Sequence, residues 1–504
     1  MADQLYIGID SGTQGTKAVV LSEGKSRIIA ESYHGYDLIE NDRGGREQRP
    51  ESWIGACRAV LQEILGSPNV DAEQVRGIGV SGQQHGMVPV DSAGQVIRPA
   101  KLWCDTETVG QCRTITRRVG GEAAVVNKIG NQVAAGFTAS KILWLKENEP
   151  ENYARLSTVL LPHDYINFWL TGERKTEYGD ASGTAYFDVE NRCWSDEMLQ
   201  AIDPSEKLKQ CLPELIAPDE PTGRIAKELA DEFGLPSDVL VSSGGGDNMM
   251  AAIGTGNVRE GVVTASLGTS GTIYAYSDRP IIDNSGELAA FCSSTGGWLP
   301  LVCTMNVTVA TELVRNLFLL DIAEMNRLAA SVEPGAGGLL LLPYFNGERT
   351  PALPLAKATL TGLSSLTMRA EMICRAAMEG ATFGLRYGFD IIRRNGIEPK
   401  EMRLAGGGAK SEVWRQIVAD IFNCEVVCLE QEEAGAVGAA MQALWCVETA
   451  NGNSTTIDDI ARRFVRLDES SRCRPQSSAV GSYDTLYQNY LKLNQTMARF
   501  YDDG

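Results

Sequence analysis

Histidine and paired cysteines are scarce in this 504-residue sequence. Its three histidines are His34, His85 and His163, and its twelve cysteines form no C-x-x-C pair, with only Cys424 and Cys428 close together. Zinc sites and disulfide frameworks need such groups at short spacings. The sequence therefore predicts no metal cluster of histidine and cysteine, and it predicts that the cysteines are reduced and buried.

Long apolar runs and net positive charge are also missing. No run of 18 apolar residues occurs, and the start "MADQLYIGID" lacks the basic and apolar regions of a secretory signal. The formal net charge of −19 repels nucleic-acid backbones and anionic membranes. We expect a cytoplasmic protein that binds small molecules, with no nucleic-acid or membrane partner. The oligomeric state stays open, with a homodimer among the alternatives.

Neither common nucleotide-binding loop is present, since no G-x-x-x-x-G-K-[ST] and no dinucleotide G-x-G-x-x-G occurs. A G-T-x-G-T sequence is instead written twice, in "IGIDSGTQGTKAVV" (7–20) and "VTASLGTSGTIYAY" (263–276). Each copy predicts a strand, a tight turn and a second strand. Asp10 in the first copy corresponds to Ser266 in the second, about half the chain later.

The order of elements around the two copies also repeats. After the first hairpin, a third strand is expected over 26–33, an amphipathic helix over 50–65 and a buried strand in "VRGIGVSG". The second half has a strand pair, helices over 307–318 and 370–394, and then "MRLAGGGAKSEVWRQIVADIF". This order predicts an α/β fold in which each of two related domains has a sheet with helix crossovers.

The chain is too long for one hydrophobic core, so two domains facing a cleft are expected. We place them at 1–244 and 245–504, with helices and loops of 106–236 inserted in the first. A surface helix is predicted over 483–500.

The two hairpins can offer backbone N–H groups and threonine hydroxyls to a polyphosphate, although each alone could be an ordinary tight turn. Asp10 ends a buried strand, where an ionised carboxylate needs a partner. Hydrated Mg²⁺ would supply that partner, and a turn-capping role is the alternative.

Asp247 follows the glycines of "GGGDN", in a loop expected to be flexible at the start of a helix. A helix cap is the ordinary role of such a residue. Its place at the expected domain junction favours a second role, as the base that accepts a proton from a substrate hydroxyl during phosphoryl transfer.

Two further loops carry groups suited to a sugar. "SGQQHG" places Gln83, Gln84 and His85 after a strand end, and "LWCD" offers Trp103 as an apolar platform and Asp105 as an acceptor. Amides and an imidazole can donate to and accept from hydroxyls. A structural histidine and a core tryptophan are the alternatives.

With these residues assembled, the chain resembles the FGGY family of carbohydrate kinases, which are relatives of actin. The similarity runs over nearly the whole length, in family order and spacing. The motifs that carry it are "DSGTQGTK", "SLGTSG", "GFTASKILWLKEN", "LPHDYINFWLTGE", "GDASG", "GGGDN", "NGERTP" and "AGGGAKSEVWRQ".

The resemblance implies an actin-like (ribonuclease H-like) fold of two duplicated domains with ATP in the cleft between them. It implies that Asp247 is the catalytic base and that Asp10 lies near Mg²⁺. It assigns sugar binding to Gln84, His85, Asn248, Trp103 and Asp105. It assigns ATP binding to Gly12, Thr13, Lys17, Gly268, Thr269, Gly407, Gly408 and Ala409.

The sugar-binding loops depart from the family pattern. Where the family usually has Gln-Met-His-Gly, this chain has Gln-Gln-His-Gly, and where the family has Leu-Trp-Asn-Asp it has Leu-Trp-Cys-Asp. The family also commonly has an arginine two residues after that aspartate, and this chain has Glu107 there. The expected reaction is ATP-dependent phosphorylation of the 5-hydroxyl of D-xylulose. A sibling kinase for another ketose, a polyol or gluconate is the nearest alternative, and an actin-like chaperone ATPase or filament protein is the alternative from another class.

Overall fold

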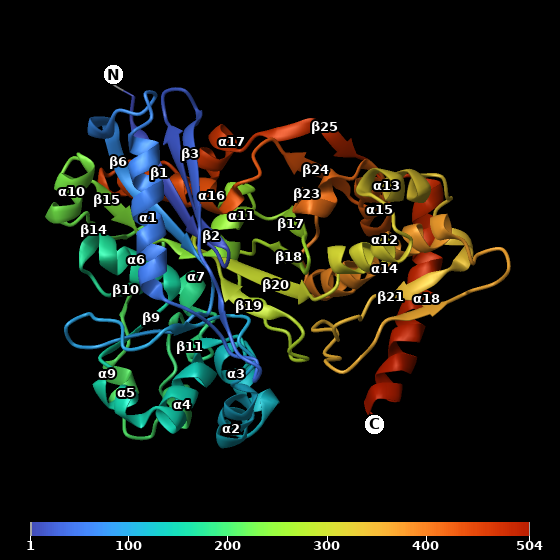
Figure 1. Cartoon of the computed structure of the whole chain (residues 1–504), viewed down its shortest axis with the longest axis horizontal. Coiled ribbons are helices and arrows are strands. Elements are labelled where there is room, and N and C mark those ends of the chain that lie inside the picture. The colour runs from blue at the N-terminus through green and yellow to red at the C-terminus, as the bar shows by residue number, and fades with distance from the viewer. Residues whose placement is uncertain (1–2, 503–504) are drawn as a thin grey trace. The chain divides into compact units, whose positions relative to one another are not determined.

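The computed structural model describes residues 3–502, which form two compact units (Figure 1). Unit 1 is made of the chain up to Arg259 together with Ser277–Leu299 and Glu433–Val465; unit 2 is made of Glu260–Tyr276, Pro300–Glu432 and the chain from Arg466. These units group segments by packing, whereas the boundary expected at Gly244 marks where a duplicated sequence begins again. That boundary stays a prediction.

The central sheet of unit 1 has the strand order β14-β15-β6-β1-β2-β3, with β16 also paired to β6. The strands are β1 (Leu5–Ser11), β2 (Gly15–Ser22), β3 (Arg27–Gly35), β6 (Val75–Gly82), β14 (Pro221–Arg224), β15 (Leu240–Ser242) and β16 (Gly245–Gly246). Strand β1 is antiparallel to β2 and parallel to β6, so the predicted hairpin and the buried "VRGIGVSG" strand are both confirmed.

The sheet of unit 2 repeats this arrangement, in the order β20-β18-β17-β23-β24-β25. The strands are β17 (Val262–Leu267), β18 (Gly271–Ala275), β20 (Trp298–Thr304, in unit 2 from Pro300), β23 (Glu401–Ala405), β24 (Glu425–Leu429) and β25 (Leu467–Cys473). Asp10 pairs with Lys17 on its antiparallel neighbour and with Ser81 on its parallel one. Ser266 pairs in the same way with Thr272 and Ala405, which confirms the predicted duplication.

Helices cover both faces of the unit 1 sheet. On one face, α1 (Pro50–Leu65) packs its apolar stripe against Ile7 and Ile9 of β1. Side chains alternate along a strand, so Gly8 faces the other side, where α16 (Ala434–Ala450) crosses β1 and β6 and contacts α11 (Asp247–Gly254). Asp10 has the same parity as Gly8 and lies on that face.

The backbone of α16 lies directly against the backbone of β1, β6 and α11, because glycines stand at the contacts. A Cβ added at Gly8 would overlap the carbonyl oxygen of Ala436, and one at Gly79 would overlap that of Ala439. Gly438 of α16 is equally close to the backbone of α11. No side-chain rotation could relieve these overlaps, so glycine is required for the close approach.

The rest of unit 1 has a second core beneath the insertion expected over 106–236. Its remaining helices are α2 (Val109–Val119), α3 (Glu122–Ile129), α4 (Thr138–Asn148), α5 (Pro150–Arg155), α6 (Pro162–Thr171), α7 (Tyr178–Ala181), α8 (Asp196–Ile202), α9 (Lys207–Gln210), α10 (Lys227–Phe233) and α17 (Ile457–Phe464). Its short strands are β4 (Ile39–Glu40), β5 (Arg46–Gln48), β7 (Val88–Val90), β8 (Ala100–Lys101), β9 (Thr158–Leu160), β10 (Lys175–Glu177), β11 (Phe187–Asp188), β12 (Cys193–Trp194), β13 (Glu214–Ile216) and β19 (Ala289–Cys292).

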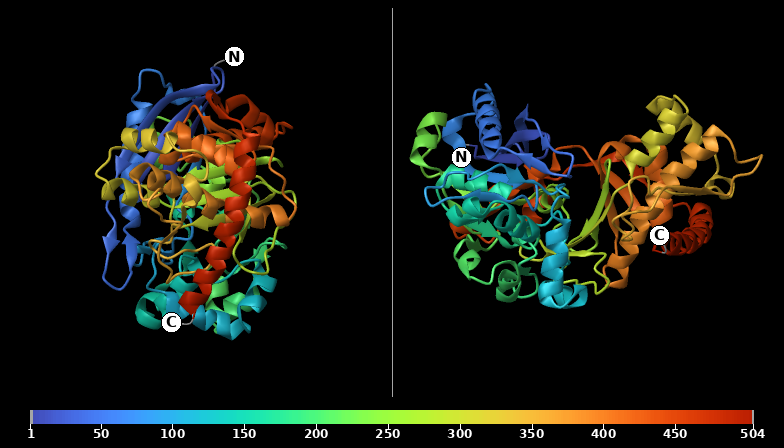
Figure 2. Two further views of the ribbon diagram at one scale, coloured as in Figure 1. Left: turned by 90° about the vertical axis from the view of Figure 1, so that its right-hand side faces the viewer. Right: turned by 60° about the horizontal axis from the view of Figure 1, so that its bottom comes forward.

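Unit 2 contains the helices predicted over 307–318 and 370–394. Its elements besides the sheet are α12 (Thr308–Leu317), α13 (Ile322–Ala330), α14 (Ala370–Arg394), α15 (Glu412–Phe422), α18 (Ser477–Asp502), β21 (Leu340–Leu342) and β22 (Thr359–Thr361). Helix α18, the long red helix in Figure 2, is longer than expected and only partly at the surface. Its Tyr483, Tyr487 and Tyr490 are buried in contact with Phe383 of α14.

Two expectations from composition can be compared with the described residues. None of the helices between residues 3 and 502 has the length and apolar character needed to span a bilayer. All twelve cysteines are free thiols, and most are buried as expected, whereas Cys193 is exposed.

We predict that Gly8→Ala lowers the free energy of unfolding by about 2–3 kcal/mol, because the new Cβ must displace the backbone of α16. Calorimetric unfolding of the two proteins measures this change. Gly55 is the control: it lies in α1 with nothing within 4 Å of an added Cβ. Gly55→Ala should stabilise the protein by about 0.5–1 kcal/mol. Equal effects at the two positions would contradict the packing argument.

Candidate active site

Asp10 lies at the end of β1 and faces α16. The hydroxyl of Ser81, its neighbour on β6, donates a 2.6 Å hydrogen bond to Oδ1. Burial raises the pKa of Asp10, and the charge of Glu433 acts in the same direction, while the Ser81 hydrogen bond and Lys17 oppose it. A Cβ at Gly435 would come within 2.7 Å of Oδ2, so glycine allows the start of α16 to lie this close to the carboxylate.

Asp247 is the first residue of α11, after the N-cap residue Gly246. Its Oδ1 accepts hydrogen bonds from the backbone N–H (2.7 Å) and Nδ2 (3.0 Å) of Asn248. Burial, followed by the charge of Asp10, raises the pKa of Asp247 to about 7. A carboxyl group at the start of a helix with a pKa this high can both accept and release a proton near neutral pH.

The glycine stretch before Asp247 forms part of the sheet, where the sequence suggested a flexible loop. Gly244, Gly245 and Gly246 are buried, and the last two pair with Ser81 and Gly82 of β6. The expectation was wrong because β16 extends the sheet over two residues that have no side-chain propensity for a strand. Asp247 is therefore held by the sheet.

Gln84 is hydrogen-bonded to the start of α11, the helix that begins at Asp247. Asn248 Nδ2 donates a 2.8 Å hydrogen bond to Gln84 Oε1. The Nε2 group of Gln84 is buried and has no hydrogen-bond partner among the described residues. An unpaired buried amide costs roughly 1–3 kcal/mol, which a bound hydroxyl oxygen would offset.

The imidazole of His85 is packed among aromatic rings. Its centroid lies 4.4 Å from that of Phe137 and 5.7 Å from that of Phe291. A Cβ at Gly183 would overlap the ring, so Gly183 leaves the space in which it sits. His85 also has a φ of +64°, which is uncommon for a residue with a side chain.

The turn of the first hairpin is tied to both sugar loops. Thr13 Oγ1 accepts a 3.0 Å hydrogen bond from Trp103 Nε1 and donates a 3.4 Å bond to Gln83 Oε1. Trp103 is 37% exposed, consistent with a platform at a surface. Gly12 closes the turn through a 3.0 Å backbone bond to Gly15.

Lys17, on β2, has a partner that sequence reasoning missed. Both carboxylate oxygens of Glu433, the N-cap residue of α16, lie 2.6 Å from its ammonium group. Both side chains are partly exposed. The separation of 416 positions in the sequence explains why no local pattern indicated the pair of Lys17 and Glu433.

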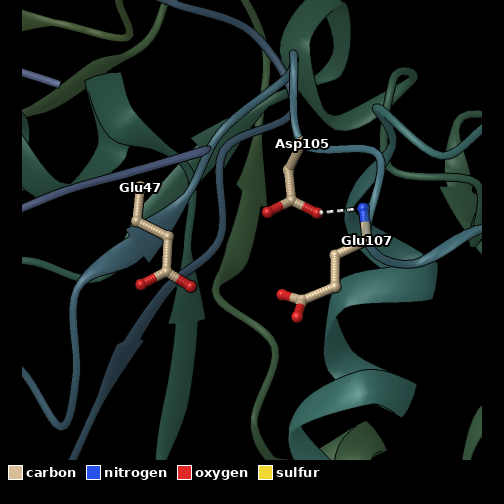
Figure 3. Close-up of side chains that lie close together, drawn as sticks. All are labelled: Glu47, Asp105 and Glu107. Carbon is tan, nitrogen blue, oxygen red and sulfur yellow. Dashed lines mark hydrogen bonds between the residues drawn. The ribbon is translucent and has the colours of Figure 1, made fainter. Parts of the chain in front are cut away.

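Asp105 belongs to an acidic cluster with Glu47 and Glu107, shown in Figure 3. Within residues 3–502 it is the only group of three with metal-ligating geometry. The buried ammonium of Lys101 already lies 3.2, 3.0 and 2.7 Å from Glu47, Asp105 and Glu107, respectively. Its position 4.0 Å from the ring centroid of Trp144 adds a cation–π contact. Lysine thus supplies the cation that a metal would otherwise provide.

One departure from the family pattern lies in this cluster, where Glu107 pairs with Lys101 at 2.7 Å. Asp105 itself is fully buried and accepts bonds from Lys101 and from the backbone N–H groups of Arg46 and Glu107. A direct contact between Asp105 and a sugar stays a prediction. The observed bonds show that Asp105 fixes the loop carrying Trp103.

Unit 2 brings its two glycine motifs together. Gly406, at φ +87°, packs against Leu267 and the backbone N of Gly268 at the end of β17. The carbonyl groups of Gly268 and Thr269 accept bonds from Thr308 and Val307, at the start of α12. The predicted ATP-binding residues Gly407, Gly408 and Ala409 form the short turn that precedes α15.

Two duplicated sheets with acidic residues at strand and helix ends define a protein of the actin-like kinase class. The model of the N-terminal domain of the FGGY family of carbohydrate kinases matches residues 5–254, and that of the C-terminal domain matches residues 263–447. The chain belongs to this family.

Named relatives extend over nearly the full chain. The xylulose kinase of Haemophilus influenzae is 47% identical over 97% of this chain and 99% of its own length. The xylulose kinase of Bacillus subtilis is 35% identical over 97% of this chain and 96% of its own length. Among solved structures, the xylulose kinase from Brucella ovis has a TM-score of 0.91 at 29% identity, covering 99% of this chain and all of that one. The family resemblance inferred from the motifs is confirmed.

We predict that Asp247→Asn stabilises the ligand-free protein increasingly as pH rises. Between the ordinary pKa of 3.8 and about 7 the folded chain holds this proton more tightly than the unfolded chain. Folding stability therefore falls with pH across that window, by up to about 1.4 kcal/mol per pH unit, and asparagine removes this cost. The difference in Tm between the two proteins, measured by calorimetry, should grow from pH about 4 to about 7 and then level off.

Asp91 provides a control of opposite sign. Hydrogen bonds, first from the Gln95 backbone, lower the pKa of this partly exposed carboxylate. Asp91→Asn should therefore lose stability at neutral pH, with the loss disappearing only as pH falls below the ordinary value. A Tm difference for Asp247→Asn that is the same at every pH would contradict the assignment.

Proposed function

We propose that this carbohydrate kinase transfers the γ-phosphoryl group of ATP to the 5-hydroxyl of D-xylulose, giving D-xylulose 5-phosphate and ADP. The observation that carries the proposal is the unpartnered Nε2 donor of Gln84, bonded through its own oxygen to Asn248 beside Asp247. A proton acceptor and a free hydroxyl-binding donor are thus joined in one network. The names of the full-length relatives support the choice of sugar.

Asp247 is the proposed catalytic base. A general base works best when its pKa lies near the operating pH, and the pKa of Asp247 is about 7. Its Oδ1 is engaged by Asn248, which orients the carboxyl group. In the proposed reaction it accepts the proton of the 5-hydroxyl as that oxygen bonds to the γ-phosphorus and the bond from this phosphorus to the β,γ-bridging oxygen breaks.

Mg²⁺ is the proposed metal partner of Asp10. Mg²⁺ prefers oxygen ligands and keeps several waters, so the carboxylate of Asp10 is a suitable ligand for a hydrated ion. The Ser81 hydroxyl fixes Oδ1, and Gly435 places no side chain against Oδ2. When bound, the ion would supply charge neutralisation for the phosphate groups.

The remaining ATP assignments are extended from the family resemblance. Lys17 would exchange Glu433 for phosphate oxygens, because an ammonium group is a mobile point charge. The phosphate-binding residues we propose are Gly12, Thr13, Gly268 and Thr269. Those for adenosine are Gly407, Gly408 and Ala409.

Sugar recognition is assigned to Gln84, His85, Asn248 and Trp103. The amide and imidazole groups would bond hydroxyls, and the exposed face of Trp103 would contact the carbon chain. For Asp105 we propose chiefly a supporting role, through the loop that it fixes.

Asp247→Ala should lower kcat for D-xylulose phosphorylation by about 10²–10⁴-fold, because the proton acceptor is lost. Binding of ATP, measured by calorimetry, should change little. Turnover close to that of the wild type would exclude Asp247 as the base. Asp188→Ala removes a partly exposed carboxylate at the end of β11 in the same unit and controls for loss of a carboxylate in general.

The sugar assignment is tested by a coupled ADP-release assay with pentuloses, hexuloses, polyols and gluconate. D-xylulose should give the highest kcat/KM, and ADP release without sugar should be slow. Preference for another compound in the panel would move the assignment to a sibling kinase. ADP release that no sugar stimulates would point to a nucleotide-switched protein without sugar chemistry.

A further inference from the structure

Lys141 is a fully buried lysine whose ammonium group is hydrogen-bonded to backbone carbonyl groups. It lies in the first turn of α4, and its Nζ donates to the backbone carbonyl oxygens of His85 (2.6 Å) and Gly136 (2.5 Å). Thr138 Oγ1 donates a second hydrogen bond, of 3.2 Å, to the His85 carbonyl. Two side chains of one helix start therefore converge on a single backbone oxygen of the proposed sugar loop.

The backbone that they hold is strained. The left-handed φ of +64° costs a residue with a side chain on the order of 1–3 kcal/mol, and it persists only where the surroundings enforce it. The neighbouring Phe137 packs on the imidazole of the same residue, with centroids 4.4 Å apart. The start of α4 thus fixes both the backbone and the ring of His85.

Burying a lysine costs free energy, because its ammonium group loses contact with water. Burial lowers the pKa of Lys141 to about 7, with Asp105 acting in the opposite direction. An apolar chain of similar length would avoid this desolvation, so packing alone does not account for the amine. Either form of the amine can donate to carbonyl groups, so the geometry does not depend on its charge.

We propose that Lys141 is a positioning residue for the sugar: it holds the His85 loop in the conformation that presents Gln84 and His85 to the substrate. This inference rests on the proposed function, because those two residues are assigned to the sugar there. Lys141 does not touch substrate in this proposal and acts through the His85 carbonyl.

The test compares Lys141→Met with Lys146→Met. Both remove a lysine from α4, but Lys146 pairs with Asp203 and not with the sugar loop. Lys141→Met should raise the KM for D-xylulose by about tenfold or more, leaving the KM for ATP within about twofold, since only the sugar loop loses a restraint. Lys146→Met should lower the Tm and leave both KM values within about twofold.

Thr138→Val is a milder variant that removes the second bond to the same carbonyl with little change in shape. It should raise the sugar KM by about two- to fivefold, which decides the matter if Lys141→Met does not fold. Equal KM values for sugar in Thr138→Val and wild type, or parallel rises for sugar and ATP in Lys141→Met, would overturn the proposal.

Hydrogen–deuterium exchange separates this inference from the proposed function. The peptide around His85 should exchange faster in Thr138→Val and Lys141→Met than in Lys146→Met, whichever sugar the wild type accepts. Unchanged exchange would refute positioning. Faster exchange in a protein that phosphorylates no sugar would refute the proposed function and the sugar role, while retaining the restraint on the loop.

Discussion

The close packing of α16 against the unit 1 sheet is the contact on which the proposed site depends. Gly8 and Gly79 let the helix backbone approach the sheet, and Gly438 lets it approach α11. This contact places Glu433 beside Lys17 and Gly435 beside Asp10. It also packs α11, which begins at Asp247, into the same layer. A wider spacing would separate the two acidic residues from the elements that set their environment.

Electrostatic balance around the site is achieved in two different ways. Asp10 and Asp247 are partly buried and form no ion pair with a described residue, and desolvation raises the pKa of each. Asp105, by contrast, has Lys101 as a permanent partner. Carboxylates that lack a built-in cation are suited to a transient ion or proton, whereas those around Lys101 stabilise a loop.

The sequence predicted those parts of the fold that depend on local pattern. Strand alternation and the doubled G-T-x-G-T motif led to both hairpins and to the Asp10–Ser266 equivalence, which the pairing of Ser81 and Ala405 matches. Partners chosen across the fold could not be predicted. Glu433 meets Lys17 only because α16 returns to unit 1, and Glu47 meets Lys101 only because β5 pairs with β8. The pairing of Gly245 with β6 was likewise invisible, since glycine has no strand propensity.

The return of α16 to unit 1 also sets an order on synthesis of this FGGY-family kinase. In the sequence, residues 260–432 separate the strands of the first sheet from the helix that covers it. Of these residues only the segment 277–299 belongs to unit 1, and the others belong to unit 2. A ribosome releases the chain from its N-terminus, so the Gly8 and Gly79 face stays uncovered until Ala450 has emerged. The first domain to be made is therefore among the last to close, and a chain shortened before α16 would leave that face of the sheet uncovered.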